Sequence, residues 1–114
     1  MSLHAFVTGT GWRNEDGSSR SRIIRRHCQM GTEVEFRKVP PRPPESHGVA
    51  VVVKVPRLMG LLPAADRTIG FVEAKVAARL LARLDAGETV RARVRSLHAP
   101  IEKDEPRVGL ALDE

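Results

Sequence analysis

The chain has 114 residues, 41% hydrophobic and 29% charged, so we expect one globular domain over residues 1–114 with its core at about 5–112, and we exclude wholesale disorder. The net charge of +5 lies wholly in the first 60 residues, and arginine supplies 15 of the 19 cations. This excess favours an anionic partner. The alternative is a GC-rich genome, which encodes arginine in place of lysine without any such partner. The longest apolar run, residues 48–53, is far too short to span a membrane. A single cysteine excludes an intrachain disulfide. We therefore expect a cytoplasmic protein, which would be associated with the nucleoid if it binds DNA.

The first 39 residues contain three predicted elements and one long loop. Residues 3–8 alternate in polarity and predict a strand. Residues 9–19 are rich in turn formers and predict a surface loop. An apolar stripe over residues 21–29 predicts a short helix with arginines on its other face. Residues 32–39 alternate again and predict a second strand.

Two proline-containing connections flank the next strand. Residues 40–44, Pro-Pro-Arg-Pro-Pro, lack a backbone donor at four of five positions and predict an exposed, stiff connection. They also fit the Pro-x-x-Pro pattern that aromatic grooves bind, the alternative being a rigid loop within a barrel. Residues 49–55 are the most β-branched stretch and predict the most buried strand. Residues 56–67 predict a second irregular connection, whose apolar side chains we expect to fold over a core opening or to meet a partner.

The second half adds one helix and three strands. Residues 68–72 predict a short strand, and residues 73–86 carry the clearest helical periodicity. Residues 89–98 alternate, with arginines on the outer face, and residues 108–112 predict a last strand. Six short strands are too few for a doubly wound parallel sheet. We therefore expect a mainly β (α+β) fold, a small six-stranded, largely antiparallel OB/SH3-like barrel with two helices.

Motifs for catalysis and for cofactor binding are lacking. The Gly9-Thr10-Gly11 segment has no third glycine and no helix directly behind it, as a dinucleotide loop would, and no lysine follows a glycine as in a phosphate-binding loop. No Gly-x-Ser-x-Gly elbow is present. Cys28 and the four histidines have no metal-ligand spacing. We expect no enzymatic activity, no cofactor and no metal, with Cys28 as a core residue.

Features typical of nucleic-acid binding are better represented. Trp12 lies in a glycine-rich loop beside Arg13, which predicts a base-stacking platform next to a phosphate contact. The alternative is that Trp12 closes the end of the barrel as a core residue. Arg20 and Arg22 belong to an arginine cluster that either lines a groove for the nucleic-acid backbone or forms a solvated helix face.

Several motifs resemble the HIRAN family, which is found N-terminal to helicase-like DNA-repair motors and as short stand-alone bacterial proteins. The best-matching stretch is residues 68–77, Thr-Ile-Gly-Phe-Val-Glu-Ala-Lys-Val-Ala, which is similar to the family's Ile-Gly-aromatic/His-Leu-Pro step from a strand into a helix. Residues 6–9, Phe-Val-Thr-Gly, followed by Trp12, are similar to the opening Val-x-Gly with aromatics behind it. Residues 37–40, Arg-Lys-Val-Pro, resemble the Arg-Glu-Pro that ends the second strand.

Residues 42–51 resemble part of the family signature Asn-Pro-Tyr-Asp-x-Asn-Ala-Ile-x-Val. Pro43, Val49 and Val51 agree, and Glu45 keeps the acidic position. The departures are three substitutions: Arg42 for the first Asn, Pro44 for the Tyr and His47 for the second Asn. The resemblance to the family covers about residues 5–98.

The resemblance implies a DNA-binding module for single-stranded DNA or DNA 3′ ends, active in DNA repair or replication-fork processing, with a helicase or repair protein as a candidate partner. Aromatic side chains would stack terminal bases, an acidic side chain would accept a hydrogen bond from the 3′-hydroxyl, and basic side chains would hold phosphates. By position, Trp12 takes the stacking role and Glu45 is the acceptor for the 3′-hydroxyl. Phe71 is the residue that follows the strand glycine. We expect these three residues to converge on one basic-rimmed pocket. The expected DNA-binding set is Trp12, Arg13, Arg20, Arg22, Arg42, Glu45, His47, Phe71 and Lys75. The alternative is a protein-interaction module whose barrel has lost DNA binding.

Overall fold

The computed structural model describes residues 2–42, 46–57, 60–98 and 105–113. In chain order its elements are β1 (Ser2–Thr8), α1 (Arg20–His27), β2 (Glu33–Lys38), β3 (Val49–Arg57), β4 (Leu62–Val72), α2 (Ala74–Asp85), β5 (Arg91–His98) and β6 (Arg107–Asp113). The sequence predicts this same order of strands and helices.

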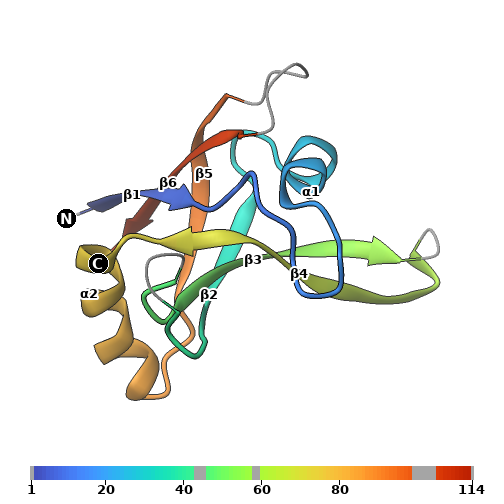
Figure 1. Cartoon of the computed structure of the whole chain (residues 1–114). Coiled ribbons are helices and arrows are strands. Elements are labelled where there is room, and N and C mark those ends of the chain that lie inside the picture. The colour runs from blue at the N-terminus through green and yellow to red at the C-terminus, as the bar shows by residue number, and fades with distance from the viewer. Residues whose placement is uncertain (1, 43–45, 58–59, 99–104, 114) are drawn as a thin grey trace.

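The six strands form a closed barrel in the order β1-β4-β3-β2-β5-β6 (Figure 1). Every neighbouring pair is antiparallel. β1 closes the barrel because it pairs with β6 over residues 2–6 and with β4 over residues 7–8. The predicted fold class, a mainly β, six-stranded antiparallel barrel with two helices, is confirmed.

Alternating side chains of the strands fill the barrel. Along β2, Val34 and Phe36 are buried, while the charged residues between and beside them are exposed or half-buried. Residues 49–53 of β3 are all buried, since a small apolar cluster also covers the outer face of the sheet there. This outer cluster consists of Val39, Ala50, Val52 and Phe71.

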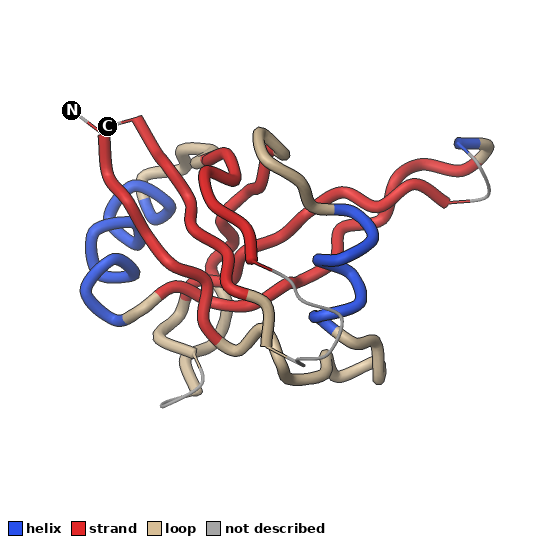
Figure 2. Tube along the Cα trace, turned by 90° about the horizontal axis from the view of Figure 1, so that it is seen from above, coloured by secondary structure: helices blue, strands red, loops and turns tan. Residues whose placement is uncertain are grey.

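The two helices lie on different sides of the barrel (Figures 1 and 2). α1 directs Ile23, Ile24 and Cys28 into the main core. Burial raises the pKa of the Cys28 thiol to about 11, and Cys28 is the core residue that the sequence predicts. α2 buries Val76 and Leu80 against the barrel. Neither helix in the described ranges is long and apolar enough to cross a membrane.

The prediction of an irregular connection over residues 56–67 is wrong. β3 runs on to Arg57 and β4 already begins at Leu62, and the two strands extend together well beyond the barrel (Figures 1 and 2). Lys54 pairs with Asp66 in this extension, and Arg57 pairs with Leu62 after a register shift. We call the extension, residues 54–57 and 62–67, the arm.

The physical reason lies in the edges of the arm. β2 pairs with β3 only as far as Val52, and β1 pairs with β4 only at its last two residues, so the strands of the arm pair with each other alone. A proline lacks a backbone donor, which costs little where a strand has no partner on that side. Pro56 and Pro63 therefore indicate a free strand edge here and not a break in the strands.

Candidate nucleic-acid interface

The loop between β1 and α1 is fixed by hydrogen bonds at both of its ends. Gly9 turns the chain at the end of β1 with a φ of +72°, a left-handed conformation that favours glycine. Its carbonyl oxygen accepts from the backbone N of Trp12 at 3.2 Å and from Nη1 of Arg20 at 3.1 Å. Arg13 Nη1 donates to the carbonyl of Gly17 at 2.8 Å. The predicted surface loop thus holds one conformation around Trp12.

The tip of this loop is tied to β4. Asp16 Oδ1 accepts from the backbone N of Ser18 at 2.9 Å and from its Oγ at 2.6 Å. Asp16 Oδ2 forms an ion pair with Nη1 of Arg67 at 2.8 Å. The pKa of Asp16 is lowered chiefly by the hydrogen bonds from Ser18, with Arg67 adding to the effect. The carboxylate is therefore the form that the loop stabilises.

Arg20 differs from the prediction of an exposed phosphate contact. Only 5% of the residue is exposed, and its Nε donates to Oδ1 of Asn14 at 2.8 Å. Its Cζ lies 4.8 Å from the centroid of the Phe71 ring, a cation–π distance. A buried guanidinium needs such partners, and the loop supplies them by folding back over the first turn of α1. Arg20 thus joins the loop, the helix and β4.

Asn14 completes this link from the other side. Its Nδ2 donates to the carbonyl of Thr68 on β4 at 3.0 Å and to Oγ of Ser18 at 3.0 Å, while its Oδ1 accepts from Arg20. Sequence reasoning missed Asn14, because an asparagine among turn formers carries no sign of a contact 54 residues away.

Phe71 is positioned by a close approach of β1 and β4. A Cβ atom at Gly70 would overlap the carbonyl oxygen of Thr8 and Cγ1 of Val7, so only glycine allows the two strands to come this near. Thr8 Oγ1 then donates to the carbonyl of Phe71 at 3.1 Å. The ring of Phe71 points out of the barrel into the outer apolar cluster. The Ile-Gly-Phe motif thus places an aromatic ring on the outer surface at a fixed position.

A cavity of about 700 Å³ lies over this surface. Its floor includes Ala50 and Phe71, one wall is residues 12–16 of the loop, and another is made by the chain around Arg42. Trp12 is 58% exposed. The alternative in which Trp12 closes the barrel as a core residue is therefore wrong. Trp12 and Phe71, two of the three residues expected in one pocket, both line this cavity.

The charge of the cavity differs from the expected basic rim. Among the described residues, its lining contains three arginines and three carboxylates, whose formal charges cancel: Arg13, Arg20, Arg42, Glu15, Asp16 and Asp66. The reason is that the arginines of α1 contribute only Arg20 to the lining, while the loop and the arm contribute acidic residues.

Each lining carboxylate has a cationic partner. Glu15 pairs with Nη1 of Arg42 at 3.1 Å, and both side chains are largely exposed. Asp66 pairs with Nη2 of Arg37 at 2.8 Å and with Nζ of Lys54 at 3.4 Å, both outside the lining. Together with the Asp16–Arg67 pair, these contacts neutralise the acidic side of the cavity.

Arg42 and Ser46 are paired through their backbones. The backbone N of each donates to the carbonyl of the other at 3.0 Å, and both residues line the cavity. Ser46 Oγ accepts from the backbone N of Gly48 at 3.2 Å, which fixes the chain as it enters β3. Glu45, the expected hydroxyl acceptor, lies outside the described residues together with Pro43 and Pro44.

Three residues of the expected set do not line the cavity. Arg22 is exposed on α1, His47 is half-buried shortly before β3, and Lys75 is exposed in the first turn of α2. The cavity instead recruits Thr68 and Asp66 from β4. Sequence reasoning missed Asp66 because it placed residues 56–67 in an irregular connection, and it placed Thr68 in a strand without giving it a role in the site.

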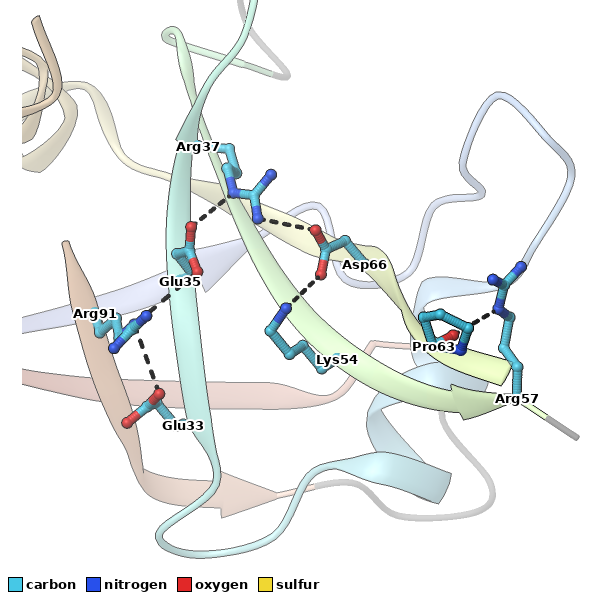
Figure 3. Close-up of polar contacts among 8 residues, drawn as sticks. All are labelled: Glu33, Glu35, Arg37, Lys54, Arg57, Pro63, Asp66 and Arg91. Atoms are coloured by element: carbon cyan, nitrogen blue, oxygen red, sulfur yellow. Dashed lines mark hydrogen bonds and ion pairs between the residues drawn. The ribbon is translucent and has the colours of Figure 1, made fainter. Parts of the chain in front are cut away.

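The outward arginines of β5 belong to a different surface. Figure 3 shows Arg91 between Glu33 and Glu35, at N–O distances of 3.7 and 4.0 Å, with Arg37 and Asp66 continuing the row of charges toward Lys54. Arg93 also pairs with Glu33, at 3.5 Å. These are cross-strand pairs on the outside of the barrel, which are worth little individually. Neither arginine lines the cavity.

Comparisons of the chain with protein-family models, with curated proteins and with solved structures find no match. Within the part of the chain that the structure describes, no three His, Cys, Asp or Glu side chains are grouped so that they could hold a metal ion.

Proposed function

We propose that the protein is a non-enzymatic DNA-binding module, which binds single-stranded DNA and takes the nucleotide at a 3′ end into the cavity. The observation that carries this proposal is an exposed indole, Trp12, on the wall of a cavity that also holds Phe71, Arg13 and Arg42. A volume of about 700 Å³ lies within the range of sites for small ligands, and a nucleotide is of that size class.

The energetics of these side chains suit a nucleotide. Stacking of a base on an aromatic side chain contributes about 1–3 kcal/mol. The Arg42–Glu15 pair is largely exposed, and such pairs contribute about 0–1 kcal/mol, so a phosphate can replace Glu15 as the partner of Arg42 at little cost. Arg13 uses Nη1 for Gly17, and a guanidinium has further N–H donors to offer a phosphate.

End recognition is the finer part of the proposal and rests on the HIRAN resemblance. Glu45 would accept a hydrogen bond from the 3′-hydroxyl and repel a phosphate at the same position. Arg42 and Ser46 flank Glu45 in the sequence, and both line the cavity. A role in DNA repair beside a helicase follows from the same resemblance.

Fluorescence anisotropy with a labelled single-stranded oligonucleotide at two salt concentrations tests the proposal. If about three to five phosphates are bound, the affinity should fall with salt at a log–log slope of about −2 to −3.5. A 3′-phosphate should bind more weakly than a 3′-hydroxyl. Absence of binding at low salt would overturn DNA binding, whereas equal affinity for the two ends would overturn end recognition alone.

Replacement of the indole gives a sharper test. Trp12→Ala should weaken binding of single-stranded DNA by about 1–3 kcal/mol, because one base loses its stacking partner. Leu61→Ala is the matched control, since Leu61 is 85% exposed, apolar and remote from the cavity lining. Equal affinities of wild type, Trp12→Ala and Leu61→Ala would show that no base stacks on Trp12.

The arm favours a second candidate function, protein interaction. It projects from the barrel (Figure 2) and pairs with no other strand. Leu62, where its second strand begins, and the preceding Leu61 are both exposed. Pull-down after nuclease treatment discriminates between the two functions. A partner that survives nuclease and is lost with Leu61→Ser favours protein interaction, whereas partners that nuclease removes favour DNA binding.

A further inference from the structure

A second hollow of about 420 Å³ lies next to the cavity and shares Trp12 with it. Phe6 of β1 and Thr10 of the loop line it on one side, and Pro106 and Arg107 at the start of β6 line it on the other. Trp12 is the one residue that lines both spaces as they are described. The indole therefore stands as a common wall between the cavity and a second aromatic surface.

Phe6 is an unusual residue for the outside of a strand. Ala5 and Val7 point into the core, while Phe6 points outward and is 65% exposed. Its partner on the adjacent strand β6 is Gly109, and a Cβ atom at Gly109 would lie 3.5 Å from Cε1 of Phe6. The ring thus lies over a glycine of the adjacent strand, an arrangement that supports an aromatic ring on a sheet surface. Phe6 therefore exposes an aromatic ring to solvent while Gly109 of β6 lies beneath it.

The hollow is built from segments far apart in the sequence. Thr10 Oγ1 donates to the carbonyl of Pro106 at 2.7 Å, and this buried hydrogen bond ties the loop that carries Trp12 to the start of β6. Thr10 and Pro106 are both buried, so the contact is part of the fold. The backbone segments that carry Trp12, Phe6 and Arg107 are therefore held together by contacts within the fold.

We propose that this hollow is a second nucleotide subsite, in which the base next to the terminal one stacks on Phe6 while Arg107 contacts its phosphate. The inference rests on the proposed function of the cavity and extends it from one nucleotide to two consecutive nucleotides on either side of Trp12. The occupant is single-stranded nucleic acid, because the hollow continues the cavity, presents an aromatic face and has an exposed arginine at its edge.

Glu105 also lines the hollow, so the formal charges of its described lining residues, Glu105 and Arg107, cancel, and the affinity for a base should come mainly from stacking. A loss of affinity on removal of Phe6 should therefore depend on the base and only weakly on salt. This distinguishes the subsite from a general electrostatic surface, whose contribution falls steeply with salt.

The test is a double-mutant cycle between Phe6 and one base. The ligands are two oligonucleotides of about six nucleotides, one intact and one abasic at the position next to the 3′ end. Trp12 is the only tryptophan and the chain has no tyrosine, so quenching of its fluorescence reports binding directly. The proteins are wild type, Phe6→Ala, Phe6→Tyr and Met30→Ala, because Met30 is as exposed as Phe6 and lines neither space.

We expect Phe6→Ala to weaken binding of the intact oligonucleotide about 5- to 150-fold and to leave binding of the abasic one unchanged. Phe6→Tyr should bind like wild type, since it keeps the ring, and Met30→Ala should also bind like wild type. An equal loss with both oligonucleotides, or no loss with either, overturns the subsite while wild type still binds DNA. Failure of wild type itself to bind the intact oligonucleotide overturns the proposed function instead.

Discussion

β3 and β4 pass through two environments, and the two parts of this hairpin behave differently. In the barrel, Val51 and Ile69 are completely buried, and each strand has partners on both sides. In the arm, both strands lose their second partner and most side chains are exposed. Burial of apolar side chains stabilises the barrel part of the hairpin, whereas the arm is held mainly by the pairing of its two strands with each other. The following predictions test this difference, from the largest expected effect to the smallest.

The largest effect is expected from a glycine in the barrel part. Gly70→Ala introduces a Cβ atom that overlaps backbone and side-chain atoms of β1, so we expect a loss of about 3 kcal/mol or more in the free energy of unfolding. Gly60→Ala is the matched change at the end of the arm. Gly60 has a φ of +90° but no neighbour within 4 Å, so the loss there should be about 1–2 kcal/mol. Chemical denaturation measures the free energy of unfolding of both variants. Equal losses would contradict the expected difference between the barrel part and the arm.

Two valines of β3 give an intermediate effect. Val51→Ala removes two methyl groups from a fully buried position and should lower the free energy of unfolding by about 2 kcal/mol. Val55→Ala makes the same change at a half-buried position of the arm and should cost less than about 1 kcal/mol. A larger loss at Val55 would show that the arm is part of the cooperative core.

The smallest effect concerns the ion pairs at the root of the arm. Partial burial raises the pKa of Asp66, but Lys54 and Arg37 lower it by more, so the pKa lies below its ordinary value. A carboxyl with a depressed folded pKa stabilises the fold above its unfolded pKa of about 3.9, and that contribution is lost as the pH falls through the folded pKa. Asp66→Asn should therefore destabilise slightly at pH 7, by less than about 1 kcal/mol because the partners are exposed.

The same measurement at about pH 2–3 checks the sign of this effect, since the difference between wild type and Asp66→Asn should shrink there as Asp66 becomes protonated. A difference that grows toward low pH would mean that Asp66 is not stabilised as a carboxylate. Lys54→Met, measured beside it, should reduce the pH dependence, because it removes one of the two cations that face the carboxyl.

Periodicity predicted most of the barrel from the sequence. The alternation around Phe36 and around Val94 and the apolar stripe through Leu80 correspond to buried faces of real strands and a real helix. The arm could not be predicted in this way, because most of its side chains are exposed and its inner side is only half-buried, at Val55, Ala65 and Arg67, so the apolar alternation is weak. Pro56 and Pro63 suggested an irregular connection, but proline is tolerated at the free edges of these strands.

The candidate site was predicted only in part, for a different physical reason. Trp12 stands out by residue type, Phe71 and Arg42 were expected from the resemblance to the HIRAN family, and all three line one cavity. The inward position of Arg20 depends on Asn14 and the Gly9 carbonyl, which come from a loop whose fold is set by contacts distant in sequence. The paired carboxylates also come from outside the matched motifs. Residue type and the resemblance predicted which side chains could bind, whereas contacts distant in sequence decide which of them are exposed in the cavity.

The sealed position of Cys28 has a practical consequence. With a pKa of about 11, only about one thiol in ten thousand is ionised at neutral pH, and the sulfur is covered by α1 and the barrel wall. Alkylating reagents should therefore modify the native chain only when α1 lifts away from the barrel. The rate of modification in rising denaturant would then report how often this end of the molecule opens, without any added label.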